Sequence, residues 1–130
     1  MASIRLDMTL RADPAQVWDA VRDVGAIHTR LAPDFVTDVK MDGDARIVTF
    51  ANGLVARELI VDLDDEASRL VWSVVGGRLT HHNGSIQVSP ADSGCHLVWI
   101  ADILPNELRP PIAEMMRQGM AAMKKKLESA

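Results

Sequence analysis

Two adjacent histidines, His81 and His82, are the side chains in this sequence best suited to acid–base or metal chemistry. They follow a Gly-Gly dipeptide in the segment LVWSVVGGRLTHHNG, and the chain has only four histidines. Imidazole titrates near neutral pH and is a common metal ligand. Because successive side chains on a regular strand point to opposite faces, only one of the two histidines faces the interior. We therefore expect no metal site built on the pair.

The strand register around these histidines follows from assuming a two-residue turn at 76–77 and a second turn centred on SPADSG. The predicted cross-strand pairs are Trp72–His81, Val71–His82, Asp102–His81, Ala101–His82 and Gln87–His96. This register places His82 on the apolar inner face and His81 on the polar outer face. It also places Trp72 outside, which requires a bulge near Gly84, a subunit contact or a different register. His82 and His96 are then about five residue pairs apart, roughly 17 Å, and do not share an ion.

Three residues are candidates for a catalytic role. His82 orients or protonates a ligand in one interpretation, and is a hydrogen-bonded core histidine in the other. His28 guards the mouth of a cavity or is a solvated helix residue. Arg57 and Glu58 are neighbours within one strand, so one of them faces inward and needs a polar partner. Arg57 is interpreted as a contact for a ligand carboxylate or carbonyl group, or as half of a cross-strand ion pair.

The elements that must position these residues are mostly short strands. Residues 4–10 alternate apolar and polar side chains, as in a strand with one buried face. Asp13 and Pro14 then begin a helix that Gly25 ends or breaks, and a second short helix over 26–32 stops at Pro33. Six further β-branched runs, separated by turn residues, predict a meander of strands at 35–41, 45–50, 54–63, 69–75, 78–88 and 95–103.

The last segment of the chain predicts a long amphipathic helix. Pro110 and Pro111 fit only its first turn, so we expect it to begin near Arg109. The inward stripe comprises Leu108, Ile112, Met115, Met116, Gly119, Met120, Met123 and Leu127. Four of the seven methionines lie on this stripe. Flexible thioether side chains suit an adaptable apolar pocket, although a filled core also uses them.

This order of elements predicts one α+β domain over residues 1–130. A seven-stranded antiparallel sheet wraps around the long C-terminal helix, and two short helices separate its first two strands.

Three segments carry a resemblance to a known superfamily: DPAQVWDAVRDVGAIHTRLAP, ARELIVDLDDEASRLVWSVVGG and HLVWIADILP. They resemble the START-like, or Bet v 1-like (SRPBCC), helix-grip superfamily, and most closely its bacterial polyketide cyclase/dehydrase and lipid-transport branch. The resemblance implies an apolar cavity between sheet and helix that holds a lipid, a polyketide or another apolar molecule. Some members are cyclases or aromatases. Many relatives carry an aromatic residue and a histidine before the proline that follows the short helices, where this chain has Leu31 and Ala32.

We therefore expect a small apolar ligand to bind in such a cavity. The expected ligand-binding residues are Trp99, His82, Arg57, Leu97, Met115, Met116, Met120 and Met123. The first alternative is an enzyme of the polyketide cyclase, aromatase or dehydratase type that uses His82, His28 and Arg57. The second is a protein-interaction module with a filled core and a dimer face that includes Trp72.

Composition limits the partners and the compartment. A formal net charge of −4 argues against a nucleic-acid partner, because phosphate binding needs clustered Lys and Arg. Cys95 is the only cysteine, and the N-terminal residues have no long apolar stretch, so we expect a cytoplasmic protein without membrane insertion. No motif implies a cofactor or a metal. We expect a monomer or a homodimer.

Overall fold

The first and last strands of the chain pair with each other and so join the two ends of the fold. In the computed structural model, which describes residues 1–129, strand β1 (Ala2–Leu10) is antiparallel to β7 (Gly94–Leu104). The other strands are β2 (Val36–Asp42), β3 (Ala45–Phe50), β4 (Val55–Asp64), β5 (Arg69–Val75) and β6 (His81–Ala91). Together they form one antiparallel sheet in the order β1-β7-β6-β5-β4-β3-β2, which confirms the predicted seven-stranded sheet.

The helices also follow the predicted order. Helix α1 (Pro14–Arg22) has Asp13 as its N-cap and ends three residues before Gly25. A five-residue π-helical turn, η1 (Ile27–Leu31), follows it, and a 3₁₀ turn, η2 (Asn106–Leu108), precedes the last helix. That helix, α2 (Arg109–Leu127), begins where the two prolines require. No helix within residues 1–129 is both long and apolar enough to cross a membrane.

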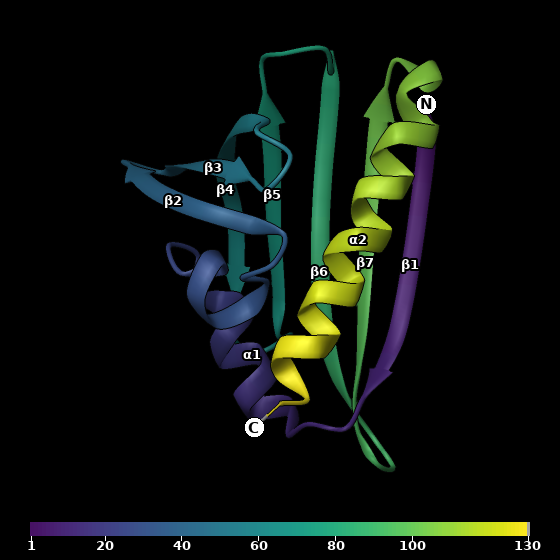
Figure 1. The fold of residues 1–130 in the computed structure, drawn as a ribbon. Helices are drawn as coiled ribbons and strands as arrows, with labels where there is room; N and C mark the ends of the chain where they lie inside the picture. The colour runs from purple at the N-terminus through teal and green to yellow at the C-terminus, as the bar shows by residue number, and fades with distance from the viewer. Residues whose placement is uncertain (130) are drawn as a thin grey trace.

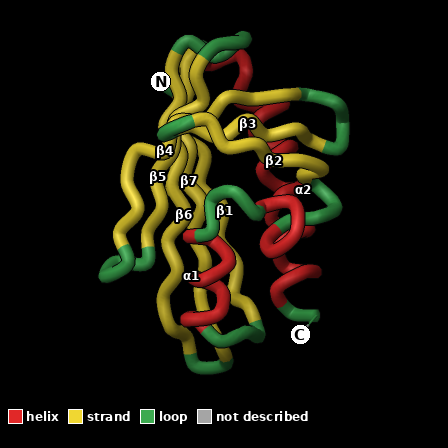
Figure 2. Tube along the Cα trace, turned by 90° about the vertical axis from the view of Figure 1, so that its left-hand side faces the viewer, coloured by secondary structure: helices red, strands yellow, loops and turns green. Residues whose placement is uncertain are grey.

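The sheet is strongly curved around α2. Strands β2 and β3 run across the direction of β6 and β7 and reach toward the helix, which lies along one face of the sheet (Figures 1 and 2). This arrangement is a helix-grip fold. The C-terminal half of α2 packs with α1 and with strands β1, β5, β6 and β7 in a large core cluster that includes Leu10, Val17, Leu97, Met120 and Met123. The N-terminal half of α2 packs against β1 and β7 in a second cluster that includes Ile4, Ile103 and Met116.

The register places Trp72 on the inner face, which corrects the predicted outward position. Trp72 pairs with Gly84 and not with His81, because the β5–β6 connection is a longer loop than a two-residue turn. In the next hairpin His82 pairs with Ile103 and His81 with Leu104, a shift of two residues from the predicted pairs. A shift by an even number keeps each side chain on its face, whereas an odd shift reverses it. His82 therefore stays inside as predicted.

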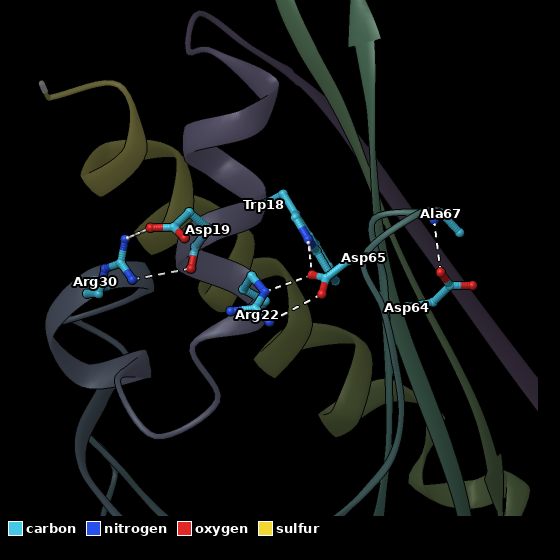
Figure 3. A network of polar contacts seen from close by, with 7 residues as sticks. All are labelled: Trp18, Asp19, Arg22, Arg30, Asp64, Asp65 and Ala67. Carbon is cyan, nitrogen blue, oxygen red and sulfur yellow. Dashed lines mark hydrogen bonds and ion pairs between the residues drawn. The ribbon is translucent and has the colours of Figure 1, made fainter.

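Hydrogen bonds from Trp18 and Arg22 to Asp65 hold helix α1 against the β4–β5 turn (Figure 3). Trp18 Nε1 and Arg22 Nε both donate to one carboxylate oxygen of Asp65, at 2.9 and 2.7 Å. On the other side of the helix, Arg30 of η1 donates to Asp19 at 2.5 Å and to Asp23 at 2.9 Å. These contacts fix α1 and η1 over one end of the sheet and close that end of the interior.

Gly94 is predicted to be intolerant of any side chain. It begins β7 at a φ of +150°, and a Cβ atom there would lie 2.1 Å from the backbone oxygen of Leu10. Gly94→Ala should lower the free energy of unfolding by roughly 2–4 kcal/mol, because backbone strain and overpacking add. Urea denaturation measures this loss. In the control Gly43→Ala, φ is +59° and nothing lies within 4 Å, so the loss should be about 1 kcal/mol. Equal losses in both variants would contradict the steric explanation.

Candidate functional site

A cavity of about 410 Å³ lies between α2 and the inner face of the sheet. Its walls come from the short helices, from strands β2 to β7, and from the face of α2 between Pro111 and Met123. Apolar side chains dominate the lining, and they include Val48, Leu70, Trp72, Ile86, Trp99 and Met116. The volume is within the range of small-molecule sites, which are usually concave, mostly apolar and supplied with a few polar groups. The interior is therefore not a filled core.

Gly119 determines how α2 approaches the sheet beside this cavity. A Cβ atom at Gly119 would lie 2.9 Å from the Trp99 ring and 3.0 Å from the Phe35 ring. The absence of a side chain thus lets both rings lie directly against the helix. Trp99 in turn packs against Trp72, with ring centroids 6.1 Å apart, and Phe35 meets Phe50 edge-on at 5.2 Å. All four aromatic rings line the cavity.

An ion pair is buried in the cavity wall opposite α2. Arg46 Nε donates to Glu58 Oε1 at 2.8 Å, and the two side chains are only 5% and 8% exposed. Strand register places them directly opposite each other on β3 and β4. Arg46 also donates from Nη1 to the carbonyl oxygen of Val24 at 3.2 Å, and its guanidinium lies 5.6 Å from the Trp72 ring centroid. Burial raises the pKa of Glu58 above its usual range, and the nearby Arg46 charge opposes that rise.

His82 lies in the same row of side chains across the inner face. Glu58 pairs with Val74, and the Val74 N–H donates to His82 Nδ1 at 3.0 Å. Burial and, to a smaller extent, the neighbouring His81 lower the pKa of His82 to about 4, while Asp102 opposes this shift. At neutral pH the ring is therefore uncharged, and because Nδ1 accepts a hydrogen bond, its proton is on Nε2. Among the described residues no acceptor meets Nε2, and the ring lines the cavity.

Trp99 supplies a further polar atom without a partner. Its Nε1 is fully buried and has no hydrogen-bond acceptor within residues 1–129. A buried N–H without a partner is costly in a folded protein, and such groups often mark sites that a ligand or an ion satisfies.

The structure brings most of the predicted site residues together, but not all. Trp99, His82, Met115, Met116 and Met123 line the cavity. Leu97 and Met120 instead pack in the main core cluster. Arg57 reaches only the rim, since it is exposed and pairs with Asp42 on the outer face at 2.6 Å. His28 is half-buried in η1, and it does not line the cavity.

Arg46, the buried residue that contacts Glu58, Val24 and Trp72, was not identified from the sequence. The strand pattern did contain the signal, because Arg46 shares its face with the apolar Val48 and Phe50. Glu58 was predicted only as the alternative to Arg57. A hairpin centred on Asn52 places Glu58 opposite Arg46. This register, combined with the inward position of Arg46, indicates a buried ion pair.

The cavity reaches solvent between two hairpins and the start of α2. Exposed lining residues lie on the β3–β4 turn, on the β5–β6 loop and at Pro111. The rim is unusually apolar: Leu54 is 55%, Val55 62% and Val75 38% exposed. Arg57 and Arg78 are its charged residues.

Comparisons with known proteins agree with the helix-grip fold. The family model described as polyketide cyclase / dehydrase and lipid transport matches residues 1–129. An uncharacterised protein from Bacillus thuringiensis superposes with a TM-score of 0.84 at 16% identity, over 95% of this chain and 97% of its own. A protein from Thermobifida fusca gives 0.79 at 27% identity, over 98% and 91%. A norcoclaurine synthase point mutant from Thalictrum, solved with a transition-state analogue, gives 0.68 at 18% identity, over 95% and 92%. No curated protein sequence matches.

Stability is predicted to fall with decreasing pH because of His82. Unfolded His82 takes up a proton near pH 6.5, whereas the folded ring stays neutral down to about 4. The folded state therefore loses stability as the pH falls through this window, and it is fully stabilised above 6.5. The loss should be about 3 kcal/mol by pH 4.

The control for this prediction is His82→Asn, which retains an acceptor for the Val74 N–H but does not titrate. Urea unfolding of both proteins at pH 7 and pH 4 separates His82 from the carboxylates. If the difference in unfolding free energy between the two proteins stays constant over this range, the assignment to His82 is wrong.

Proposed function

The chain belongs to the polyketide cyclase / dehydrase and lipid transport family, and from this premise we propose that it binds a small apolar molecule in the cavity beside α2. One observation supports the proposal most directly. A closed sheet-and-helix domain normally fills its interior at high packing density, yet this one keeps a cavity of about 410 Å³. A space of that size with a mostly apolar lining is suited to an apolar molecule.

The ligand contacts in this proposal come from both sides of the cavity. Trp72 and Trp99 form the aromatic wall on the sheet, and Met115 and Met116 face them from α2. The thioether chains can adjust to the shape of a ligand at little cost. The apolar rim at Leu54, Val55 and Val75 gives such a molecule a path into the interior.

Partners and compartment follow from the same proposal. The partner is a small molecule and not a nucleic acid, in keeping with the net charge of −4. We place the protein in the cytoplasm, because its one cysteine, Cys95, is an unpaired buried thiol.

A second candidate function is acid–base catalysis inside the cavity. Two observations favour it: His82 presents its Nε2–H toward the cavity, and Glu58 is a buried carboxyl with a raised pKa. An N–H donor polarises a ligand carbonyl group, and a carboxylate removes a proton from the adjacent carbon. Dehydration and ring closure of keto compounds both require these two steps.

Deuterium exchange tests this second candidate without knowledge of the substrate. In D₂O buffer the wild type should accelerate exchange of the α-protons of 2-tetralone, a bicyclic ketone, as followed by NMR. His82→Asn should lose most of the acceleration, because Nε2 no longer supplies the donor. Glu114→Gln, on the exposed face of α2, is the matched control. Exchange no faster than in buffer would remove the candidate.

Apolar dye binding tests the principal proposal. Nile red should bind one-to-one and quench tryptophan fluorescence, because two of the three tryptophans line the cavity. Trp99→Phe should lose much of the quench. In contrast, Trp18→Phe should keep it, since Trp18 contacts Asp65 outside the cavity. An unsaturable signal, or equal losses in the two variants, would contradict binding beside Trp99.

A further inference from the structure

We propose that the ligand carries an uncharged hydroxyl group, and that the Arg46–Glu58 pair in the cavity wall binds this hydroxyl. The inference rests on the proposed binding function and makes it chemically more specific. It starts from the polar atoms of the pair that the fold leaves without partners.

Glu58 has one carboxylate oxygen that no protein group uses. Its Oε1 accepts from Arg46 Nε at 2.8 Å, and no described residue donates to Oε2. Within residues 1–129, the side-chain atoms that are fully buried and unpartnered are Nδ1 of His28 and Nε1 of Trp99. Oε2 of Glu58 is not among these atoms, so it is unpartnered but not fully buried. Because Glu58 is only 6% exposed and lines the cavity, the space that Oε2 meets is the cavity.

Arg46 supplies a donor beside this acceptor. Its Nε and Nη1 atoms bind Glu58 and the Val24 carbonyl, and no acceptor among residues 1–129 meets Nη2. The side chain is held in place by these two hydrogen bonds and by the Trp72 ring. The wall thus offers one fixed donor next to one fixed acceptor. A hydroxyl group is the simplest partner for both, because it donates one hydrogen bond and accepts others.

Charge argues for a neutral group at this position. The charges of Arg46 and Glu58 compensate each other, so the pair attracts neither sign strongly. A ligand carboxylate would lie beside the Glu58 carboxylate, and a ligand ammonium would lie beside the Arg46 guanidinium. Either like-charge contact is costly in an interior of low effective dielectric constant. A hydroxyl satisfies both atoms without adding a charge, and the apolar remainder of the cavity accommodates the rest of the molecule.

Four bicyclic probes separate these possibilities in the unmodified protein. Equilibrium dialysis at pH 7 measures the affinities of naphthalene, 2-naphthol, 2-methoxynaphthalene and 2-naphthoate. Phenols titrate near pH 10, so 2-naphthol is uncharged. It should bind about tenfold more tightly than naphthalene, the effect of one hydrogen bond to a charged group. The methoxy compound keeps the oxygen but lacks the O–H donor to Oε2, so it should bind less tightly than 2-naphthol.

The outcomes distinguish failure of the proposed binding function from failure of the hydroxyl inference. If none of the probes binds, the cavity does not take apolar ligands and the proposed function itself fails. If naphthalene binds and 2-naphthol gains nothing, only the hydroxyl inference is overturned. Tightest binding of 2-naphthoate would also overturn it, since Arg46 would then be recognising an anion.

A pair of variants locates the hydroxyl within the cavity. Glu58→Gln keeps an oxygen for Arg46 Nε and replaces the free oxygen with an N–H donor, from which a hydroxyl and an ether oxygen accept equally well, so the preference for 2-naphthol over 2-methoxynaphthalene should disappear. Glu114→Gln removes a carboxylate from an exposed Arg–Glu pair with Arg117 on α2 and should leave the preference intact. A 2-naphthol preference that survives in folded Glu58→Gln would contradict this location. If Glu58→Gln does not fold, the four-probe comparison in the wild type still decides the inference.

Discussion

The close approach of α2 to the sheet at Gly119 is the constraint on which the rest of the interior depends. The Trp99 and Phe35 rings lie directly against the helix there. Toward its C-terminus the helix packs tightly, because Met120 and Met123 join the core around Leu97. Toward its N-terminus the helix packs on β1 and β7 around Met116, and the cavity lies between the helix and the rest of the inner face of the sheet. One residue without a side chain thus sets how closely the helix approaches the sheet beside the cavity.

The buried ion pair is the second organising feature, and its energetics differ from those of the apolar wall. Removing charges from water costs several kcal/mol per ion, which a single pair offsets only with good geometry and additional hydrogen bonds. Arg46 has such support from Val24 and Trp72. Glu58 has support at one oxygen only. The pair is therefore supported by protein groups at Arg46 Nε, at Arg46 Nη1 and at one oxygen of Glu58, while the other carboxylate oxygen has no protein donor among residues 1–129.

Alternation of apolar and polar residues was sufficient to predict the sheet, the helices and the inward position of His82. The alternation predicted the wrong face for Trp72. The face that a side chain occupies depends on the strand register, and the pattern did not determine the length of the β5–β6 loop. The resulting register error was an odd number of residues, which reversed the predicted face. The same limit hid the Arg46–Glu58 pair, which exists only once β3 and β4 are aligned. Local patterns therefore predict which element a residue belongs to, whereas contacts between strands require the register.

The pairing of β1 with β7 has a consequence for how the protein is made. Ala2 pairs with Ile103, so β1 stays without its strand partner until β7 has been synthesised. The meander from β2 to β7 joins neighbours in sequence, whereas β1 contributes contacts of very high sequence separation, which slow folding. During synthesis the apolar face of β1 stays uncovered, and it is then most open to chaperones or to pairing with another nascent chain.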